Sequence, residues 1–148
     1  FNVTSLTIEA WVYSGNFIQN GFIFEKGPIN SQYSLFFEGL NLTFRTQHSG
    51  NSENNFVINS SDIGLTSNTW HHLAASYDGT TKKIFVDGSL VASTACTGAL
   101  LSNTVGSIIG AYGGSGAHHY KFTGLIDEVE VWNTALTNPK FKKICIMS

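Results

Sequence analysis

The segment from Trp70 to Gly88, WHHLAASYDGTTKKIFVDG, constrains the fold of this chain more than any other. Residues 72–77 alternate in character with the period of two that marks a β-strand with two different faces. Asp78-Gly79 follows, and this pair tolerates the positive φ angles of tight hairpin turns. The strand resumes at 84–86 and ends at a second Asp-Gly pair, Asp87-Gly88. A hairpin between two such turns predicts an antiparallel meander, which excludes most nucleotide-binding and α/β enzyme folds.

The rest of the chain continues this rhythm of short strands separated by turn residues. Further strand candidates are the segments 6–13, 32–38, 42–46, 56–58, 107–109 and 123–132. Clusters of Gly, Asn and Ser lie between them at fairly regular spacing, which is typical of a sandwich or barrel. Helix is expected only in 134–143, where Thr134 is a suitable N-cap and Pro139 limits any helix to a turn or two.

The composition bounds the size of the fold and its partners. The 148 residues are expected to form a single domain spanning 1–148, because a chain of this length can enclose a two-sheet core. Charged residues make up only 12% of the chain and the net charge is −2, so we expect no nucleic-acid partner. No apolar run reaches the length of a bilayer span, and membrane insertion is not expected.

Two features favour an extracellular location or a cell or particle surface. Three Asn-X-Ser/Thr sequons, at Asn2, Asn41 and Asn59, are candidate glycosylation sites, although a chain this rich in Asn, Ser and Thr contains some by chance. Cys96 and Cys145 are the only cysteines. A disulfide between them would close a long loop and contribute roughly 4 kcal/mol. Two buried free thiols are the alternative.

Three motifs occur in order along the chain: LTIEAWV from Leu6, WHHLAASYDGTTKKIFVDG from Trp70 and FTGLIDEVEVWNTAL from Phe122. Together they resemble the laminin-G-like, or concanavalin A-like, jelly-roll domain family from about Leu6 to Leu136. The resemblance implies an all-β fold of two curved antiparallel sheets, usually in extracellular or surface proteins. The family hosts lectins, adhesion modules, appendages of glycoside hydrolases and architectural domains, so the fold alone does not determine the function.

The resemblance also implies one or two further strands ahead of LTIEAWV, and only Phe1 to Ser5 precede that motif here. A missing terminal strand would leave an open groove with unpaired backbone groups. The tail 139–148 contains an alternating segment, Phe141 to Met147, that suits a β-strand. It could fold back into its own groove or be exchanged with a neighbouring copy by strand addition. Exchange would suit a structural subunit that assembles into a filament or coat.

A pair of carboxylates near the C-terminus raises the question of catalysis. Glu128 and Glu130 lie two apart and are expected on one face of a strand. The resemblance implies that retaining glycosidases of this class use a motif like Glu-X-Asp-X-Glu. Ile126 stands at the first of these positions, so we do not expect an enzyme.

Calcium is the cofactor that the resemblance implies, bound through Asp side chains and loop carbonyls. The candidate ligands are Asp127, beside an expected β-bulge, and the turn residues Asp78 and Asp87. Turn formation is the alternative for both Asp-Gly pairs. For Asp127 the alternative is a buried carboxylate bonded to backbone amides near His72.

Sugar binding needs aromatic rings that stack on sugars and planar polar groups for hydroxyls. Two loop regions supply such residues: Tyr112, His118, His119 and Tyr120 in 111–121, and Arg45 and His48 in 44–55. A long surface loop with Tyr120 packed inward is the alternative. The sequence predicts a non-catalytic carbohydrate-binding or adhesion module with glycans or glycoproteins as partners. A self-assembling structural subunit, with copies of itself as partners, is the competing hypothesis.

Overall fold

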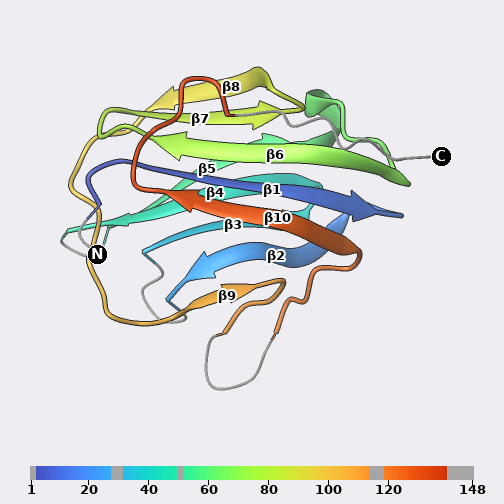
Figure 1. Cartoon of the computed structure of the whole chain (residues 1–148), viewed down its shortest axis with the longest axis horizontal. Coiled ribbons are helices and arrows are strands. Elements are labelled where there is room, and N and C mark those ends of the chain that lie inside the picture. The colour runs from blue at the N-terminus through green and yellow to red at the C-terminus, as the bar shows by residue number, and fades with distance from the viewer. Residues whose placement is uncertain (1–2, 28–31, 50–51, 114–118, 140–148) are drawn as a thin grey trace.

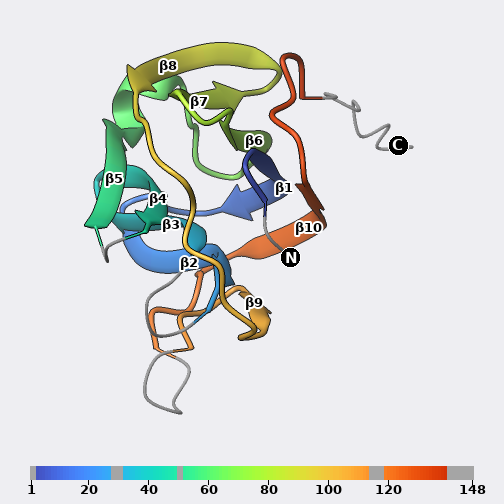
Figure 2. The same ribbon diagram turned by 90° about the vertical axis from the view of Figure 1, so that its left-hand side faces the viewer.

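The computed structural model describes residues 3–27, 32–49, 52–113 and 119–139. These residues form a sandwich of two antiparallel five-stranded sheets, as predicted (Figures 1 and 2). Sheet A has the strand order β10-β1-β6-β7-β8, and sheet B has the order β5-β4-β3-β2-β9. The strands are β1 (Leu6–Ser14), β2 (Gln19–Lys26), β3 (Tyr33–Gly39), β4 (Asn41–His48), β5 (Ser52–Asn59), β6 (Thr69–Tyr77), β7 (Thr81–Val86), β8 (Ser89–Ala95), β9 (Ser107–Ile109) and β10 (Leu125–Trp132).

The predicted hairpin is confirmed as β6 and β7, which pair in register from Leu73 opposite Val86 to Tyr77 opposite Lys82. At its turn the carboxylate of Asp78 accepts hydrogen bonds from the backbone N–H groups of Thr80 and Thr81, at 2.8 and 2.7 Å. These bonds stabilise the ionised carboxylate and therefore lower the pKa of Asp78. The bond from Thr80 has the largest effect.

The second Asp-Gly pair forms the turn between β7 and β8. Asp87 and Gly88 both have positive φ angles, 50° and 82°. This backbone conformation matches the twist of the flanking strands, and Asp and Gly are among the few residues that adopt it readily.

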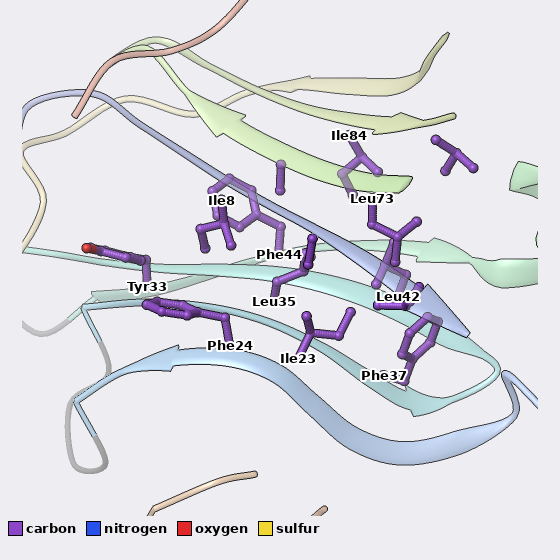
Figure 3. Packing of buried hydrophobic residues seen from close by; sticks show 14 of the residues in the cluster. Ile8, Ile23, Phe24, Tyr33, Leu35, Phe37, Leu42, Phe44, Leu73 and Ile84 are labelled. Atoms are coloured by element: carbon purple, nitrogen blue, oxygen red, sulfur yellow. The ribbon is translucent and has the colours of Figure 1, made fainter. Parts of the chain in front are cut away.

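The core fills the space between the inner faces of the two sheets (Figure 3). Alternation places Leu35 and Phe37 of β3 on this face and leaves Phe36 on the other. The side chains at its centre are at most 1% exposed: Ile8, Leu35, Phe37, Leu42, Phe44, Leu73 and Ile84. Each contributes roughly 1.5–3 kcal/mol through burial.

Two strands were not among the predicted segments. β2 contains the apolar run Phe22-Ile23-Phe24, which hides its alternation because the register against β3 shifts between Phe22 and Phe24. β8 is an edge strand whose side chains are mostly half-buried or exposed, so its alternation is weak.

The helical prediction near the C-terminus is wrong for the described residues 134–139, which contain no helix. The hydroxyl of Thr7 donates to the carbonyl of Thr134 and accepts from the N–H of Leu136, both at 2.8 Å. These backbone groups therefore pair with a strand side chain instead of with one another. The described residues contain one helical turn, the 3-10 helix η1 (Ser60–Ile63), which Asn59 caps by accepting from the N–H of Ser61.

β10 is an edge strand, and in the described residues its sole strand partner is β1. The apolar side chains of Leu125, Val131 and Trp132 on this strand are 57%, 42% and 39% exposed. Residues 140–148 lie outside the described residues, so the exchange of the tail 139–148 between copies stays a prediction.

The cysteines and sequons lie only partly within the described residues. Cys96 is a free thiol, 6% exposed, which is the alternative that the sequence leaves open, while Cys145 lies outside the described residues. Asn41 begins β4 and Asn59 caps η1, whereas Asn2 lies outside. Glycosylation stays a prediction. No helix formed by the described residues has the length and apolar character needed to cross a membrane.

Lys82 is fully buried between the sheets. Its Nζ donates to the carbonyl and side-chain oxygens of Asn54, at 2.7 and 2.9 Å, and lies 5.2 Å from the centroid of the Phe44 ring. Neutral partners compensate little for lost hydration, so burial lowers the pKa of this lysine to about 8.

We expect the free energy of unfolding to rise between pH 8 and pH 10.5, because the unfolded chain keeps its proton on Lys82 in this window while the folded chain has released it. The rise should reach up to about 3 kcal/mol. Lys82→Met should abolish this component, as urea unfolding at pH 7.5 and pH 10 can measure. Tyrosines also titrate in this range, so the difference between the two proteins is the quantity to compare. Identical pH dependence would contradict the assignment.

Candidate functional site

A pocket of about 470 Å³ opens on the outer face of sheet B. This volume lies in the range of small-molecule sites, roughly 300–1,000 Å³. The lining residues are Asn20, Phe22, Phe36, Phe37, Glu38, Arg45, Tyr112 and Tyr120. They come from β2, β3, β4 and the segment after β9, so strands distant in sequence combine to form the site.

The floor of the pocket is a cross-strand pair of phenylalanines. Phe22 and Phe36 lie directly opposite each other on β2 and β3, and their rings stack with centroids 4.4 Å apart and an interplanar angle of 7°. Directly opposed aromatic residues are among the pairs that stabilise a sheet face. This pair therefore gives the site a rigid apolar base.

The wall is formed by two described segments, residues 110–113 and 119–122. Tyr112 and His119 pair through two backbone hydrogen bonds, and the N–H of Phe22 donates to the carbonyl of Tyr120 at 3.0 Å. The carboxylate of Glu25, fully buried, accepts from the N–H of Gly113 at 2.9 Å. These bonds fasten both wall segments to β2.

The two tyrosines of the wall stand over the floor. The ring of Tyr112 lies 5.2 Å from that of Phe22 and 6.1 Å from that of Tyr120. Tyr120 is 57% exposed and has a φ of 49°, so it presents its ring to solvent from a left-handed backbone conformation. An exposed ring beside an apolar floor is suited to stacking against a ligand.

Arg45 forms one end of the pocket. Its Cζ lies 4.7 Å from the centroid of the Phe36 ring. Its Nε donates to Oδ1 of Asn55 at 3.2 Å and lies 3.3 Å from Oε1 of Glu53. Within the described residues the terminal nitrogens of the guanidinium make no hydrogen bond, so they can donate to a ligand.

Asn20 and Glu38 form the other end, opposite each other on β2 and β3. Oδ1 of Asn20 accepts from the N–H of Gly39 at 2.9 Å, which leaves its amide nitrogen as a donor. The Glu38 side chain is exposed, and its carboxylate makes no hydrogen bond or ion pair with the described residues. The pocket thus has a cation at one end and an anion at the other.

The structure brings three of the predicted sugar-binding residues together: Arg45, Tyr112 and Tyr120 line one pocket. His119 stands next to it, with its ring 6.5 Å from that of Tyr120. His48 lies in the interior, 5% exposed, where its ring contacts the hydroxyl of Thr46 at 2.8 Å. His118 lies outside the described residues.

Sequence reasoning missed Phe22, Phe36, Asn20 and Glu38. Two of them lie on β2, which was not predicted. A signal for Phe36 was present, because adjacent strand residues point to opposite faces. The pair Phe36-Phe37 therefore had to place one ring on the outer face of its sheet.

Each of the three candidate calcium ligands accepts a hydrogen bond from a backbone N–H group. Besides Asp78 in its turn, Asp87 accepts from the N–H of His72 and lies 2.8 Å from Nδ1 of His71, and Asp127 accepts from the N–H of Glu128 at 2.8 Å. Where the chain is described, no three His, Cys, Asp or Glu residues gather in a way that could hold a metal ion. Calcium binding therefore stays a prediction.

The surroundings of His72 differ from the expectation. Its Nε2 lies 3.2 Å from Oε2 of Glu9, so the nearby carboxylate comes from β1 and not from Asp127, which is exposed. Burial lowers the pKa of His72, and the charge of Glu9 raises it by less.

The expectation that Glu128 and Glu130 share one face assumed a regular strand. The register of β10 against β1 shifts between Glu9 and Trp11, which is the expected bulge beside Asp127. Glu128 itself has a φ of 45°. The simple alternation that would align these carboxylates is therefore interrupted, and both lie on sheet A, away from the pocket.

A family model described as the concanavalin A-like lectin/glucanases superfamily matches residues 1–140. The chain belongs to this superfamily. Among curated proteins, no relative matches it. Solved structures share its fold at identities below 25%, so they show the fold alone.

Three of these solved structures illustrate the range of similar proteins. A candidate carbohydrate binding protein from Bacteroides ovatus ATCC 8483 has a TM-score of 0.69 at 22% identity, covering 93% of this chain and 39% of its own. The CBM40 of Ruminococcus gnavus IT-sialidase, bound to α2,3-sialyllactose, has a TM-score of 0.73 at 14% identity, covering 92% and 79%. The SAP-like pentraxin of Limulus polyphemus has a TM-score of 0.59 at 19% identity, covering 91% and 66%. The chain thus spans well under half of the Bacteroides protein.

Gly21 tests whether the wall depends on its close approach to β2. A Cβ at this position would lie 2.8 Å from Cα of Phe122, a contact that only a backbone shift can relieve. We expect Gly21→Ala to lower the free energy of unfolding by about 1–3 kcal/mol and to raise amide exchange at Phe22, whose N–H donates to the carbonyl of Tyr120. Gly106→Ala is the matched control, since a Cβ there meets nothing within 4 Å. Equal effects of the two substitutions would contradict this role.

Proposed function

We propose that this protein is a non-catalytic carbohydrate-binding module whose sugar site is the pocket on the outer face of sheet B. One observation carries the proposal: the Phe22–Phe36 floor and two tyrosine rings lie between polar groups at both ends. A sugar ring has apolar C–H faces and a rim of hydroxyls that donate and accept. The exposed ring of Tyr120 matches those faces, and Arg45, Asn20 and Glu38 supply the donors and acceptors for the rim.

The comparisons support this proposal at the level of the fold. The Ruminococcus module is bound to a sialylated sugar, and the Bacteroides protein is described as a candidate carbohydrate binding protein. The superfamily also contains glucanases. The absence of a glycosidase carboxylate at Ile126 and the bulge at Glu128 argue against that activity here.

An extracellular location and a role in adhesion belong to the same proposal. They are supported by the resemblance of the sequence and by the sequons at Asn41 and Asn59 on described strands and turns. Mass spectrometry of the protein from its natural source would test the location, since glycans on these residues require passage through a secretory compartment.

A second candidate is self-assembly with another copy of this chain, favoured by the open edge of β10. Asp127, Glu128 and Glu130 on this strand would repel an identical strand, which disfavours pairing of two copies of β10. A basic segment fits better, such as 140–148 of a second copy, which carries three lysines. Light scattering of the whole chain tests this, and a monomer at all concentrations would contradict it.

Tyr120→Asn is the sharpest test of the sugar site. Asn tolerates the left-handed backbone conformation of Tyr120, so the change removes the exposed ring with little strain. Loss of one stacking ring should weaken glycan binding by at least about tenfold, or roughly 1.4 kcal/mol. Isothermal titration calorimetry with the best ligand from a glycan array measures the change.

The matched control is Leu90→Asn, which removes an exposed apolar side chain from sheet A, 54% exposed in the structure. The glycan affinity of this variant should equal that of the wild type. If both variants bind equally well, the sugar site lies elsewhere. If wild type binds no glycan, the proposed function is wrong.

A further inference from the structure

Resting on the proposed function, we propose that the pocket selects uncharged sugar units and rejects acidic ones, with Glu38 as the residue that determines this specificity. The inference concerns the class of sugar, which the fold does not reveal.

The two charged residues that line the pocket stand at opposite ends of its aromatic floor. Along β3 the outward positions are Ser34, Phe36 and Glu38, and Arg45 on β4 pairs with Ser34. The guanidinium leans over the Phe36 ring, while Glu38 lies beyond that ring on the far side. A sugar on the floor therefore meets a carboxylate at one end and a guanidinium at the other.

The positive charge of Arg45 is already partly compensated. Nε lies 3.3 Å from Oε1 of Glu53, and Asn55 holds both groups by accepting from Arg45 and donating to Glu53 at 2.8 Å. The guanidinium also lies against the face of Phe36. Its terminal nitrogens keep their capacity to donate, but an anion gains less Coulomb energy from a cation that is already paired.

Glu38, in contrast, has no compensating partner among the described residues. Arg45, Glu38 and Glu53 together carry one net negative charge, and the whole chain carries −2. A sugar carboxylate or sulfate near Glu38 would face like charge, which suppresses binding of the wrong partner.

Hydroxyl groups fit the same site without this penalty. The Glu38 carboxylate accepts hydrogen bonds from hydroxyls, and the amide nitrogen of Asn20 beside it donates to them. At the other end the terminal nitrogens of Arg45 donate to further hydroxyls. Such charge-assisted bonds are stronger than those between neutral groups. The pocket thus complements an uncharged polyol surface at both ends.

The test compares wild type with Glu38→Gln on an array of neutral glycans, each paired with its sialylated or sulfated derivative. Titration calorimetry then measures the affinities for the best-bound pair. Wild type should bind the neutral member at least about tenfold more tightly than the acidic one. Glu38→Gln should narrow this ratio by about threefold to tenfold, mainly by strengthening the acidic member. Gln keeps an acceptor oxygen but loses the charge-assisted bond, so affinity for the neutral member should also fall, by roughly threefold. The rise in affinity for the acidic member is therefore the result that identifies repulsion by Glu38.

Glu130→Gln is the control, because it removes the same charge from sheet A and leaves the pocket intact. It should keep the wild-type ratio. High salt should also reduce the ratio, since screening weakens repulsion at an exposed carboxylate. A wild-type preference for the acidic member, or an unchanged ratio in Glu38→Gln, would overturn the inference while leaving sugar binding in place. Binding to no glycan would overturn the proposed function and the inference together.

Discussion

Sheet B carries aromatic side chains on both of its faces, and the candidate site depends on this arrangement. Phe37 points into the core and packs with Phe17 and Phe122, while its neighbour Phe36 points outward and stacks on Phe22. Because adjacent strand residues alternate, one short stretch of β3 anchors the sandwich and also forms the pocket floor. The register of β2 against β3 is therefore a condition for both the fold and the site.

The two sheets carry different groups of polar residues. Sheet B holds the pocket, and the wall segments 110–113 and 119–122 are fastened to β2 by hydrogen bonds to Phe22 and Glu25, where Gly21 leaves room for Phe122 to approach. Sheet A holds the turn carboxylates and the buried pair of Glu9 and His72. The acidic residues that first suggested catalysis or calcium are thus on the sheet opposite the candidate sugar site. We propose that charge within the pocket determines which sugars it accepts.

Alternation and turn chemistry are local properties, so the sequence predicted most strands of a sandwich or barrel and both Asp-Gly turns, and the family resemblance implied two sheets. Three pocket residues were predicted from the aromatic and polar side chains of two loop regions. It missed β2 because a bulge interrupts the alternation there, and so it missed Phe22 and the pairing with Phe36 that forms the floor. It predicted a helical turn within 134–143, and the described part, 134–139, forms none because Thr7, far along the chain, bonds that backbone. His48 illustrates the same limit. The sequence predicted it in a surface loop, whereas it ends β4 and lies in the interior.

We propose that sugar binds over β2, β3 and β4 against the tyrosine wall. The most direct measurement is a two-dimensional ¹H–¹⁵N NMR titration of the whole chain with a neutral oligosaccharide selected from the array. The account predicts that the shifting amides cluster at Asn20, Phe22, Glu38, Arg45 and Tyr120, with sheet A unchanged. Shifts concentrated on sheet A or along the β10 edge would contradict it.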